Sequence, residues 1–211
     1  GKLSRSINGR VAVVTGAASG MGRATAHLFS DEGASVAVCD RNSEGVSEVV
    51  NESTDAGGVA SGYVVDLDDA AVIGDFISQE RDDLGPVDIL VNNAGGQFPQ
   101  KARDFSPNGW RSVIDLNLNG TWNMTQAFGN NMLEGGGGSI CQIIATVGRG
   151  IPGIAHSASA RAGVLELSRT LAFEWGPKVR VNCVAPGQFR TQAFDSTYEE
   201  GVGDGFVEQP L

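Results

Sequence analysis

Short apolar runs without polar alternation, separated by longer amphipathic stretches, are the feature that most constrains how this chain folds. Such runs are typical of strands buried on both faces of a parallel sheet that is covered by helices. Their alternation with helical stretches predicts an α/β fold, a doubly wound parallel sheet built as a single domain over residues 1–211. The expected strands are Val11–Val14, Val36–Cys39, Tyr63–Val65, Ile89–Val91, Ile140–Ile144 and Val179–Val184. The expected helices lie near residues 21–32, 43–55, 69–82, 108–134 and 157–176.

Composition excludes several classes of protein. With 211 residues and 41% apolar content, the chain suits one domain with a substantial core. It has neither a run of roughly 18 apolar residues for a membrane span nor an apolar leader, so we expect a cytoplasmic protein with no membrane partner. A net charge of −10 argues against nucleic acid as a partner. Cys39, Cys141 and Cys183 lie far apart, so neither disulfides nor a metal site are expected.

A glycine-rich turn follows the first predicted strand. The segment Thr15–Gly22 places Gly16, Gly20 and Gly22 in a GxxxGxG pattern directly before a helix. Glycines let the backbone approach a pyrophosphate, and the free N–H groups of the helix N-terminus favour negative charge. We therefore expect the turn, including Ser19 and Met21, to bind a nucleotide; a tight turn without a ligand is the alternative reading of such a motif.

Polar residues end the next three predicted strands. Asp40 follows the second strand, twenty residues after Gly20, where a carboxylate accepts hydrogen bonds from both ribose hydroxyls of an adenosine. Such an acid repels a 2′-phosphate, so Asp40 favours NAD over NADP, although Arg41 beside it weakens this preference. Asp66-Leu67 and Asn92–Gly95 end the third and fourth strands. Ligands of such sheets bind outside the carboxyl ends of the strands, so these residues are expected to share one site.

These motifs together resemble the short-chain dehydrogenase/reductase family. The matching segments are Thr15–Gly22, Asp40, Asp66, Asn92–Gly95, Asp115-Leu116-Asn117, and Arg180-Val181-Asn182 leading to Pro186-Gly187. The resemblance implies a Rossmann-like domain that binds a nicotinamide cofactor and a small-molecule substrate, in a homo-oligomer that is a dimer or tetramer. It also implies the cofactor contacts: Asp66 at adenine, Asn93, Ala94 and Gly95 beside the adenine ribose, and Pro186, Gly187, Phe189 and Thr191 at the nicotinamide carboxamide.

The end of the chain departs from the family pattern. After Pro186-Gly187 only 24 residues remain, rich in Gly, Asp and Glu, and without a strand or helix signal. Family members usually add a last strand and a helix, which are apparently missing here. Two interpretations stay open: residues 188–211 form a mobile substrate loop, or the chain is truncated or partly observed.

The catalytic residues of the family are replaced as well. The family uses Asn, Ser, Tyr and Lys, and Asn117 matches the first of these. Ser157 occupies the Tyr position and Arg161 the Lys position in His156–Gly163, and Thr146 is the only hydroxyl residue between Ser139 and Ser157. The remaining tyrosines and lysines are Tyr63, Tyr198, Lys2, Lys101 and Lys178, none of which a small alignment shift brings into register.

The pattern Ser-x-x-x-Arg in Ser157–Gly163 is similar to the peroxisomal trans-2-enoyl-CoA and 2,4-dienoyl-CoA reductases of fatty-acid metabolism. We therefore expect an NAD(H)-dependent oxidoreductase acting on an enoyl or ketoacyl thioester or a related carbonyl compound. Asn117, Ser157 and Arg161 are its candidate catalytic residues, with Arg161 also binding the cofactor ribose. The alternative is a dinucleotide-binding homologue that has lost catalysis and acts as a binding or oligomer partner.

His156 is a further candidate, since it adjoins Ser157 and imidazole is a useful general acid at neutral pH. A lone histidine at a loop–helix junction is more often a capping or packing residue. The helical stretches 108–134 and 157–176 are expected to form a four-helix interface with a second copy, as the resemblance implies.

Overall fold

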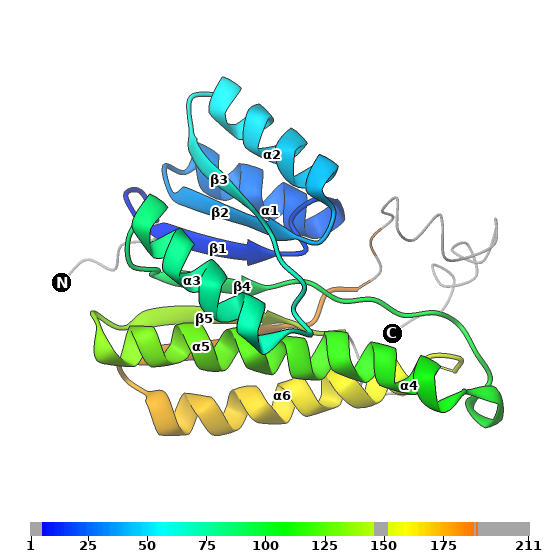
Figure 1. The fold of residues 1–211 in the computed structure, drawn as a ribbon. Helices are drawn as coiled ribbons and strands as arrows, with labels where there is room; N and C mark the ends of the chain where they lie inside the picture. The colour runs from blue at the N-terminus through cyan, green and yellow to red at the C-terminus, as the bar shows by residue number, and fades with distance from the viewer. Residues whose placement is uncertain (1–5, 146–151, 188, 190–211) are drawn as a thin grey trace.

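The protein is described by a computed structural model that covers residues 6–145, 152–187 and 189. A six-stranded parallel sheet with the order β3-β2-β1-β4-β5-β6 forms its centre (Figure 1). This order reverses between β1 and β4, as in Rossmann-like doubly wound sheets. The fold class predicted from the sequence is therefore confirmed. The strands are β1 Val11–Thr15, β2 Ser35–Asp40, β3 Val59–Val64, β4 Ile89–Asn92, β5 Gly138–Ile143 and β6 Val179–Val184.

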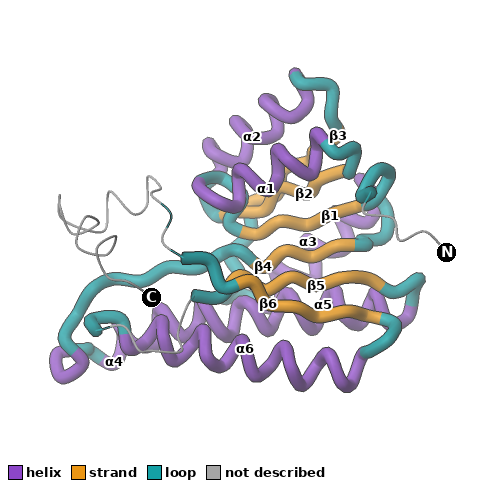
Figure 2. Tube along the Cα trace, turned by 180° about the vertical axis from the view of Figure 1, so that it is seen from behind, coloured by secondary structure: helices purple, strands orange, loops and turns teal. Residues whose placement is uncertain are grey.

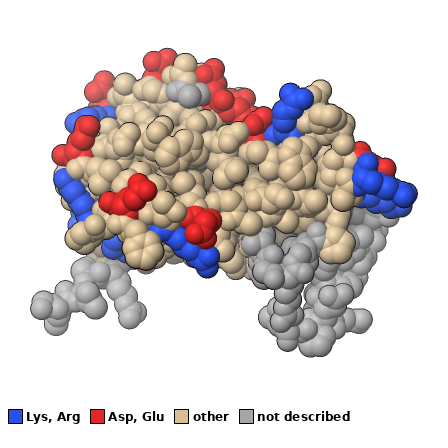
Figure 3. Space-filling model, turned by 90° about the horizontal axis from the view of Figure 1, so that it is seen from below, with Lys and Arg blue, Asp and Glu red and all other residues tan. Residues whose placement is uncertain are grey.

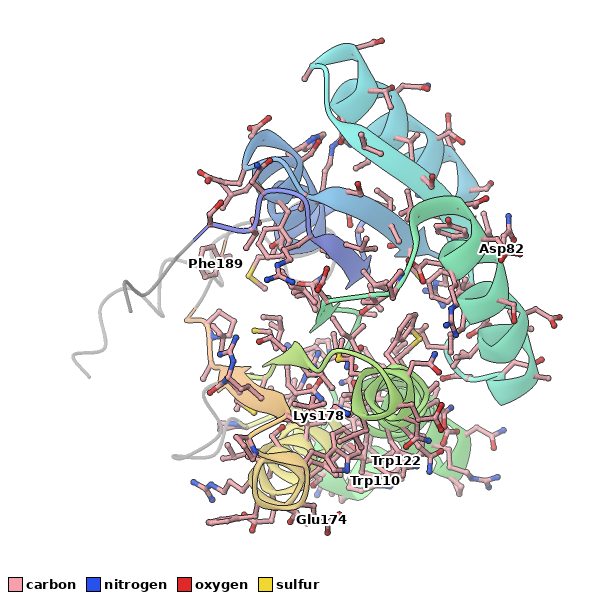
Figure 4. The ribbon with its side chains drawn as sticks, turned by 90° about the vertical axis from the view of Figure 1, so that its left-hand side faces the viewer. Asp82, Trp110, Trp122, Glu174, Lys178 and Phe189 are labelled. Atoms are coloured by element: carbon pink, nitrogen blue, oxygen red, sulfur yellow. The ribbon has the colours of Figure 1, made fainter. Side chains whose placement is uncertain are left out.

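Helices cover both faces of the sheet. The helices are α1 Gly20–Asp31, α2 Ser43–Asp55, α3 Ala70–Leu84, α4 Pro107–Ile114, α5 Thr121–Glu134 and α6 Ala155–Trp175, with short turns η1 Ala102–Asp104 and η2 Asp115–Gly120. Helices α1 and α2 lie on one face, and α3, α5 and α6 lie on the other (Figures 2 and 4). Adjacent residues of β1 divide accordingly, since Val14 packs in the cluster with Ala26 and Val49, whereas Val13 packs with Phe128 and Leu171.

Two predicted elements differ from the structure. The third strand begins at Val59 rather than Tyr63. Its residues pair with the whole of Ser35–Asp40 on β2. Tyr63 is its single buried side chain, so apolar content does not reveal the start of this edge strand. The stretch 108–134 is a helix interrupted at η2, where six residues adopt the wider π-helical turn. Apolar periodicity alone does not reveal such a local insertion.

The α1–α2 face of the sheet is covered unevenly. Strands β4, β5 and β6 face the viewer in Figure 2, and no helix of the described residues lies over them. In β6 the side chains alternate accordingly: Val179 and Val181 are buried, whereas Arg180, Asn182 and Val184 are exposed. Strand β6 is therefore buried on one face only, the face that carries Val179 and Val181.

The described cysteines are free thiols, with Cys39 buried and Cys141 and Cys183 half-buried on neighbouring strands. Among the described residues, no helix has the length and apolar content to cross a membrane. Within the same residues, His, Cys, Asp and Glu side chains form no cluster of three or more that could hold a metal ion.

Glu80 is a buried acid on α3. Its residue is only 1% exposed, and its Oε1 has no hydrogen-bond partner among the described residues. Burial and the nearby Asp83 carboxylate raise the pKa of Glu80 to about 7. Removing a carboxylate from water without a compensating hydrogen bond disfavours its charged form. The folded protein therefore binds a proton at Glu80 under conditions where the unfolded chain has already released it.

This difference predicts that stability falls as pH rises. Because the folded pKa is raised, the stability is largest below the unfolded value near 4.5 and is lost as pH rises to about 7. The shift corresponds to roughly 3 kcal/mol in the free energy of unfolding. Urea unfolding at about pH 5 and about pH 8 should show this loss in the wild type and a much smaller one in Glu80→Gln. Asp82→Asn, at an exposed site on the same helix (Figure 4), should leave the loss unchanged. An equal loss in Glu80→Gln would contradict the assignment.

Candidate active site

The glycine turn between β1 and α1 has the backbone that the motif predicts. Gly16 and Gly20 have φ angles of +63° and +54°, in the left-handed region that favours glycine. A Cβ atom on Gly22 would lie 2.1 Å from the Gly16 carbonyl oxygen, so only glycine fits there. Ser19 precedes α1 without forming a side-chain capping bond. The exposed N-terminus of α1 thus presents backbone N–H groups to an external acceptor.

Asp40 lies against this turn. One carboxylate oxygen accepts a hydrogen bond from the Ala18 N–H at 3.2 Å, and the other accepts one from the Asn42 N–H at 3.0 Å. The carboxylate is half-buried at the carboxyl end of β2, whereas Arg41 is exposed. Asp66 follows β3 and accepts from the N–H of Asp68. Burial and the negative charges of Asp66 and Asp115 raise the pKa of the Asp68 carboxyl. The positive charge of Arg41 opposes this increase in part.

A latch joins the ends of β1 and β4. The Thr15 hydroxyl accepts hydrogen bonds from the N–H groups of Asn93 and Ala94, both at 3.0 Å. The Asn93 side-chain amide in turn donates to the carbonyl oxygens of Thr15 and Gly16 at 3.0 and 3.2 Å. Asn93 was predicted from the sequence, but Thr15 was not assigned a role. A hydroxyl residue at the very end of a buried apolar strand is the signal that could have identified it.

Asn117 is buried on η2 and holds the loop after β4. Its side-chain oxygen accepts from the Gly96 N–H, and its amide donates to the Gly96 carbonyl, each at 2.8 Å. The same amide lies 3.4 Å from the Ser157 hydroxyl oxygen on α6. Asn117 and Ser157 are both almost completely buried. The structure thus brings two of the three predicted catalytic residues into contact.

Arg161 lies one helical turn after Ser157. Its guanidinium donates to the Ile143 carbonyl at the end of β5, at 2.6 Å. A Cβ atom on Gly95 would lie 1.9 Å from the Arg161 Nη2 atom and 2.9 Å from the Asn117 oxygen, so the guanidinium packs directly against Gly95. Burial lowers the pKa of Arg161 to about 10, which leaves it charged at neutral pH.

The other predicted contact residues are placed as follows. The carbonyl of Leu67 accepts a bond from Asn123, and Met21 lies in the first turn of α1. Pro186 and Gly187 follow β6 at the same edge of the sheet, and Phe189 is 56% exposed (Figure 4). Thr191, Thr146 and residues 190–211 of the predicted substrate loop lie outside the described residues.

Sequence reasoning also missed a buried polar network beneath the site. The Asn92 amide donates to the Thr125 hydroxyl and to the Gln142 side-chain oxygen, both at 2.9 Å, and Gln142 also donates to Thr125 at 2.8 Å. The network ties β4 and β5 to α5 below the loop that carries Asn93 to Gly96. Single amide residues inside apolar strands are the signal for it.

Two hollows, of about 520 and 280 Å³, lie at the opposite end of the sheet. Their linings include Arg10, Asp88 and Ser139 at the amino ends of strands, and Glu80 and Asn131. None of the predicted site residues lines them. The candidate site is therefore defined by the polar groups that converge at the carboxyl edge of the sheet.

The sheet order, the glycine turn and the acid after β2 define a Rossmann-like dinucleotide-binding domain. The family model of the short chain dehydrogenases matches residues 10–201, and the chain belongs to this family of oxidoreductases. Members of the family bind a nicotinamide dinucleotide and act on small molecules.

Named relatives cover most of the chain. It is 39% identical over 195 residues to (2S)-[(R)-hydroxy(phenyl)methyl]succinyl-CoA dehydrogenase subunit BbsD of Thauera aromatica, spanning 92% of this chain and 79% of that protein. It is 37% identical over 195 residues to a Bacillus subtilis protein named as a 2,4-dienoyl-CoA reductase, spanning 90% and 77%.

Solved structures agree with the fold. A short chain dehydrogenase from Bacillus anthracis superposes with a TM-score of 0.82 at 41% identity, over 86% of this chain and 74% of that one. A Beutenbergia cavernae protein described as an NAD(P)-dependent gluconate 5-dehydrogenase, with NADP bound, gives 0.85 at 39% identity, over 90% and 77%.

The contact between Gly95 and Arg161 makes a testable prediction. Gly95→Ala should displace the guanidinium and destabilise the protein by about 1–3 kcal/mol, as overpacking does. The loss of stability caused by Gly95→Ala should be smaller in a protein that also carries Arg161→Ala. We expect a coupling energy of about 0.5–3 kcal/mol between the two substitutions. Gly96→Ala is the control, because its Cβ meets only Leu116 at an ordinary 3.5 Å. Urea unfolding measures all four variants, and additive effects of Gly95→Ala and Arg161→Ala would disprove the contact.

Proposed function

We propose that the protein is an NAD(H)-dependent oxidoreductase that acts on an enoyl or ketoacyl thioester, with Ser157 and Arg161 in place of the family Tyr and Lys. The observation that carries this proposal is the convergence of Asn117, Ser157 and Arg161 around Gly95 and Gly96, at the edge that holds the glycine turn. Two relatives carry names of enzymes that act on CoA thioesters, which supports this substrate class.

The residues at this edge fit a nicotinamide dinucleotide. The close approach of Gly22 to Gly16 and the uncapped start of α1 suit a pyrophosphate. The proposed cofactor contacts are Gly16, Ser19, Gly20, Met21, Gly22, Asp40, Arg41, Asp66, Leu67, Asn93, Ala94, Gly95, Arg161, Pro186, Gly187, Phe189 and Thr191. When bound, the cofactor supplies or accepts a hydride at its nicotinamide ring.

The charges at the adenosine end favour NAD in this proposal. Asp40, Asp66 and Asp68 lie at the ends of neighbouring strands β2 and β3, and a 2′-phosphate would add negative charge beside them. The Beutenbergia cavernae relative is described as NAD(P) dependent and has NADP bound, so membership of the family does not by itself decide between the two cofactors. Arg41 is the group that would attract a 2′-phosphate, and its positive charge already acts on Asp68, whose pKa it lowers in part.

Each candidate catalytic residue has a role that its contacts suit. Arg161 stays charged, so it binds ribose hydroxyls and stabilises negative charge but does not release a proton at neutral pH. Asn117 positions the loop through Gly96 and orients the Ser157 hydroxyl. The Ser157 oxygen accepts from Asn117, which leaves its own proton to donate to a substrate oxygen.

A second candidate function is a dinucleotide-binding protein without catalysis. The Asn117 amide and the Arg161 guanidinium both bond to backbone groups of the protein, Gly96 and Ile143. These bonds favour a role in stabilising the fold, which is the observation in support of this alternative. An NADH-oxidation screen with crotonyl-CoA and acetoacetyl-CoA, beside calorimetry of NADH binding, separates the two. Turnover supports the oxidoreductase, and binding without turnover supports the alternative.

We also propose that the face of α5 and α6 meets a second copy of the chain. Seen from below, charged residues lie mainly toward the edges of this face, with a broad uncharged area between them (Figure 3). Phe173 on α6 is 90% exposed and adds a large apolar side chain to the surface of this helix. A homo-oligomer, a dimer or tetramer, would cover it.

Asp40 should set the cofactor preference. We expect the wild type to bind NADH more tightly than NADPH, and Asp40→Ala to narrow the difference by roughly 1.5–3 kcal/mol, the value of a charged hydrogen bond. Asp40→Asn keeps an acceptor for the Ala18 N–H and tests whether the charge itself matters. Calorimetric titration with both cofactors provides the measurement. A wild type that prefers NADPH would show that Arg41 captures the 2′-phosphate.

Arg161 should contribute to cofactor affinity. Arg161→Ala is expected to weaken NADH binding by roughly 1.5–3 kcal/mol, about 10- to 100-fold in Kd. Arg161→Lys should restore part of this affinity, because it keeps the charge. Ser157→Ala should bind NADH like the wild type and lose turnover by about 10²–10³-fold, because it removes a hydrogen-bond donor to the substrate oxygen. Unchanged NADH affinity in Arg161→Ala would remove the arginine from the cofactor site.

A further inference from the structure

His156 lies directly beside the candidate catalytic serine and is fully buried. It is the second residue of α6, and its ring is enclosed by aromatic side chains from the segment between β4 and α4. The ring centroids of Phe98 and Phe105 lie 4.7 and 4.4 Å from that of His156, and Trp110 packs against Phe105 at 6.2 Å. These rings fix the orientation of the imidazole and keep water from it.

The hydrogen bonding of the ring indicates which nitrogen carries the proton. The Ser157 N–H, free because it lies in the first turn of α6, points to the His156 Nδ1 atom at 2.7 Å. An Nδ1 that accepts a bond has no proton, so in the neutral ring the proton is on Nε2. Burial lowers the pKa of His156, and the Ile154 carbonyl opposes this only in part. The ring is therefore neutral at pH 7.

The Nε2 atom is buried and has no hydrogen-bond partner among the described residues. An unpaired buried donor costs about 1–3 kcal/mol, so such groups call for a functional or structural reason. The Phe98 and Phe105 rings that pack on the imidazole carry no oxygen or nitrogen acceptor for Nε2–H. A substrate oxygen at the Ser157 site would be such an acceptor.

We propose that His156 is a catalytic residue whose neutral Nε2–H group donates a hydrogen bond to the substrate oxygen that gains negative charge. This inference rests on the proposed oxidoreductase function and deepens it. A neutral imidazole at a helix N-terminus is a good electrophile for a carbonyl, because it donates a bond without carrying a charge of its own. With the Ser157 hydroxyl it forms a pair of donors that replaces the single tyrosine hydroxyl of the family.

The reaction balances without proton release from His156. With a nicotinamide cofactor bound at the glycine turn, its hydride would add to the β carbon of an enoyl thioester or to the keto carbon of a ketoacyl thioester, and the cofactor would be left oxidised. The displaced π electrons would move to the carbonyl oxygen, where His156 and Ser157 donate their hydrogen bonds. Water would then supply the proton, to the α carbon in the first case and to the alkoxide in the second, and the hydroxide left behind would return to the solvent.

The competing explanation is structural: a weak hydrogen bond from Nε2–H to the π face of Phe105, whose ring centroid lies 4.4 Å from that of His156, would give the histidine a packing role alone. Two variants separate the explanations. His156→Phe keeps an aromatic ring and removes the donor, whereas His156→Gln loses the ring and keeps an N–H near the Nε2 position. If His156 only packs, His156→Phe should keep more activity than His156→Gln. If it donates a hydrogen bond to the substrate, His156→Gln should keep more.

Nitrogen-15 NMR of the histidines tests the tautomer in the whole protein. The chain contains only two histidines, and His27, which bonds to Glu52, is assigned by His27→Gln. We expect His156 to be neutral at pH 7 with its proton on Nε2, and its Nε2 signal to shift when crotonyl-CoA is added to the NAD⁺ complex. A proton on Nδ1, as in a bond to Ile154, or a charged ring at pH 7 would overturn the inference.

Turnover of crotonyl-CoA and acetoacetyl-CoA completes the test. We expect His156→Phe to lower kcat by about 10²–10³-fold, as loss of an oxyanion donor does, with NADH affinity unchanged and partial recovery in His156→Gln. Wild-type turnover with an unaffected His156→Phe variant overturns the role of His156 and leaves the proposed function standing. Absence of wild-type turnover contradicts the proposed function, and the NMR result then decides the donor assignment by itself.

Discussion

The latch between Thr15 and Asn93 is the interaction on which the geometry of the site depends. It joins the last residue of β1 to the loop after β4, across the point where the strand order reverses. The glycine turn and the Asn93–Gly96 loop therefore have a fixed separation. Since Asn117 and Arg161 pack on that loop, the positions of η2 and α6 at the site follow from the same latch. A distortion there would displace the glycine turn and the residues packed around Gly95 and Gly96 together.

On the proposed function, Ser157 and Arg161 stand where the family has Tyr and Lys. Arg161 packs against Gly95 and Asn117, and among the described residues its guanidinium donates to the Ile143 carbonyl and forms no ion pair with a carboxylate. A buried cation without a paired anion favours an anionic ligand or a developing negative charge. The site is thus suited to stabilise negative charge.

Much of the architecture could be predicted because it depends on local patterns. Largely apolar runs located β1, β2, β4, β5 and β6 to within two residues at each end, and the glycine spacing located the turn. The edge strand β3 was missed at its start, since pairing with β2 rather than apolar content defines it. The break at η2 was missed because a π-helical turn leaves no periodic signal.

The site could be predicted only in part, for a related reason. Candidate residues that reach the site because a strand ends there, such as Asp40 and Asn93, can be identified from the sequence. The latch by Thr15, the network of Asn92, Thr125 and Gln142, and the enclosure of His156 by Phe98 and Phe105 depend on contacts between distant segments. No spacing rule along the chain encodes those contacts.

On the proposed function, the chemistry of the donors also constrains the substrate. Serine and neutral histidine donate hydrogen bonds but are weak acids, so the oxygen they bind has to carry its charge until water reaches it. A thioester enolate spreads this charge over oxygen and carbon, whereas the alkoxide formed from an isolated ketone concentrates it on one oxygen. Two neutral donors beside a buried arginine therefore stabilise the delocalised enolate, relative to its protonated form, better than they stabilise the alkoxide of a simple ketone. The arrangement favours conjugated thioesters over simple ketones among the substrates of this fold.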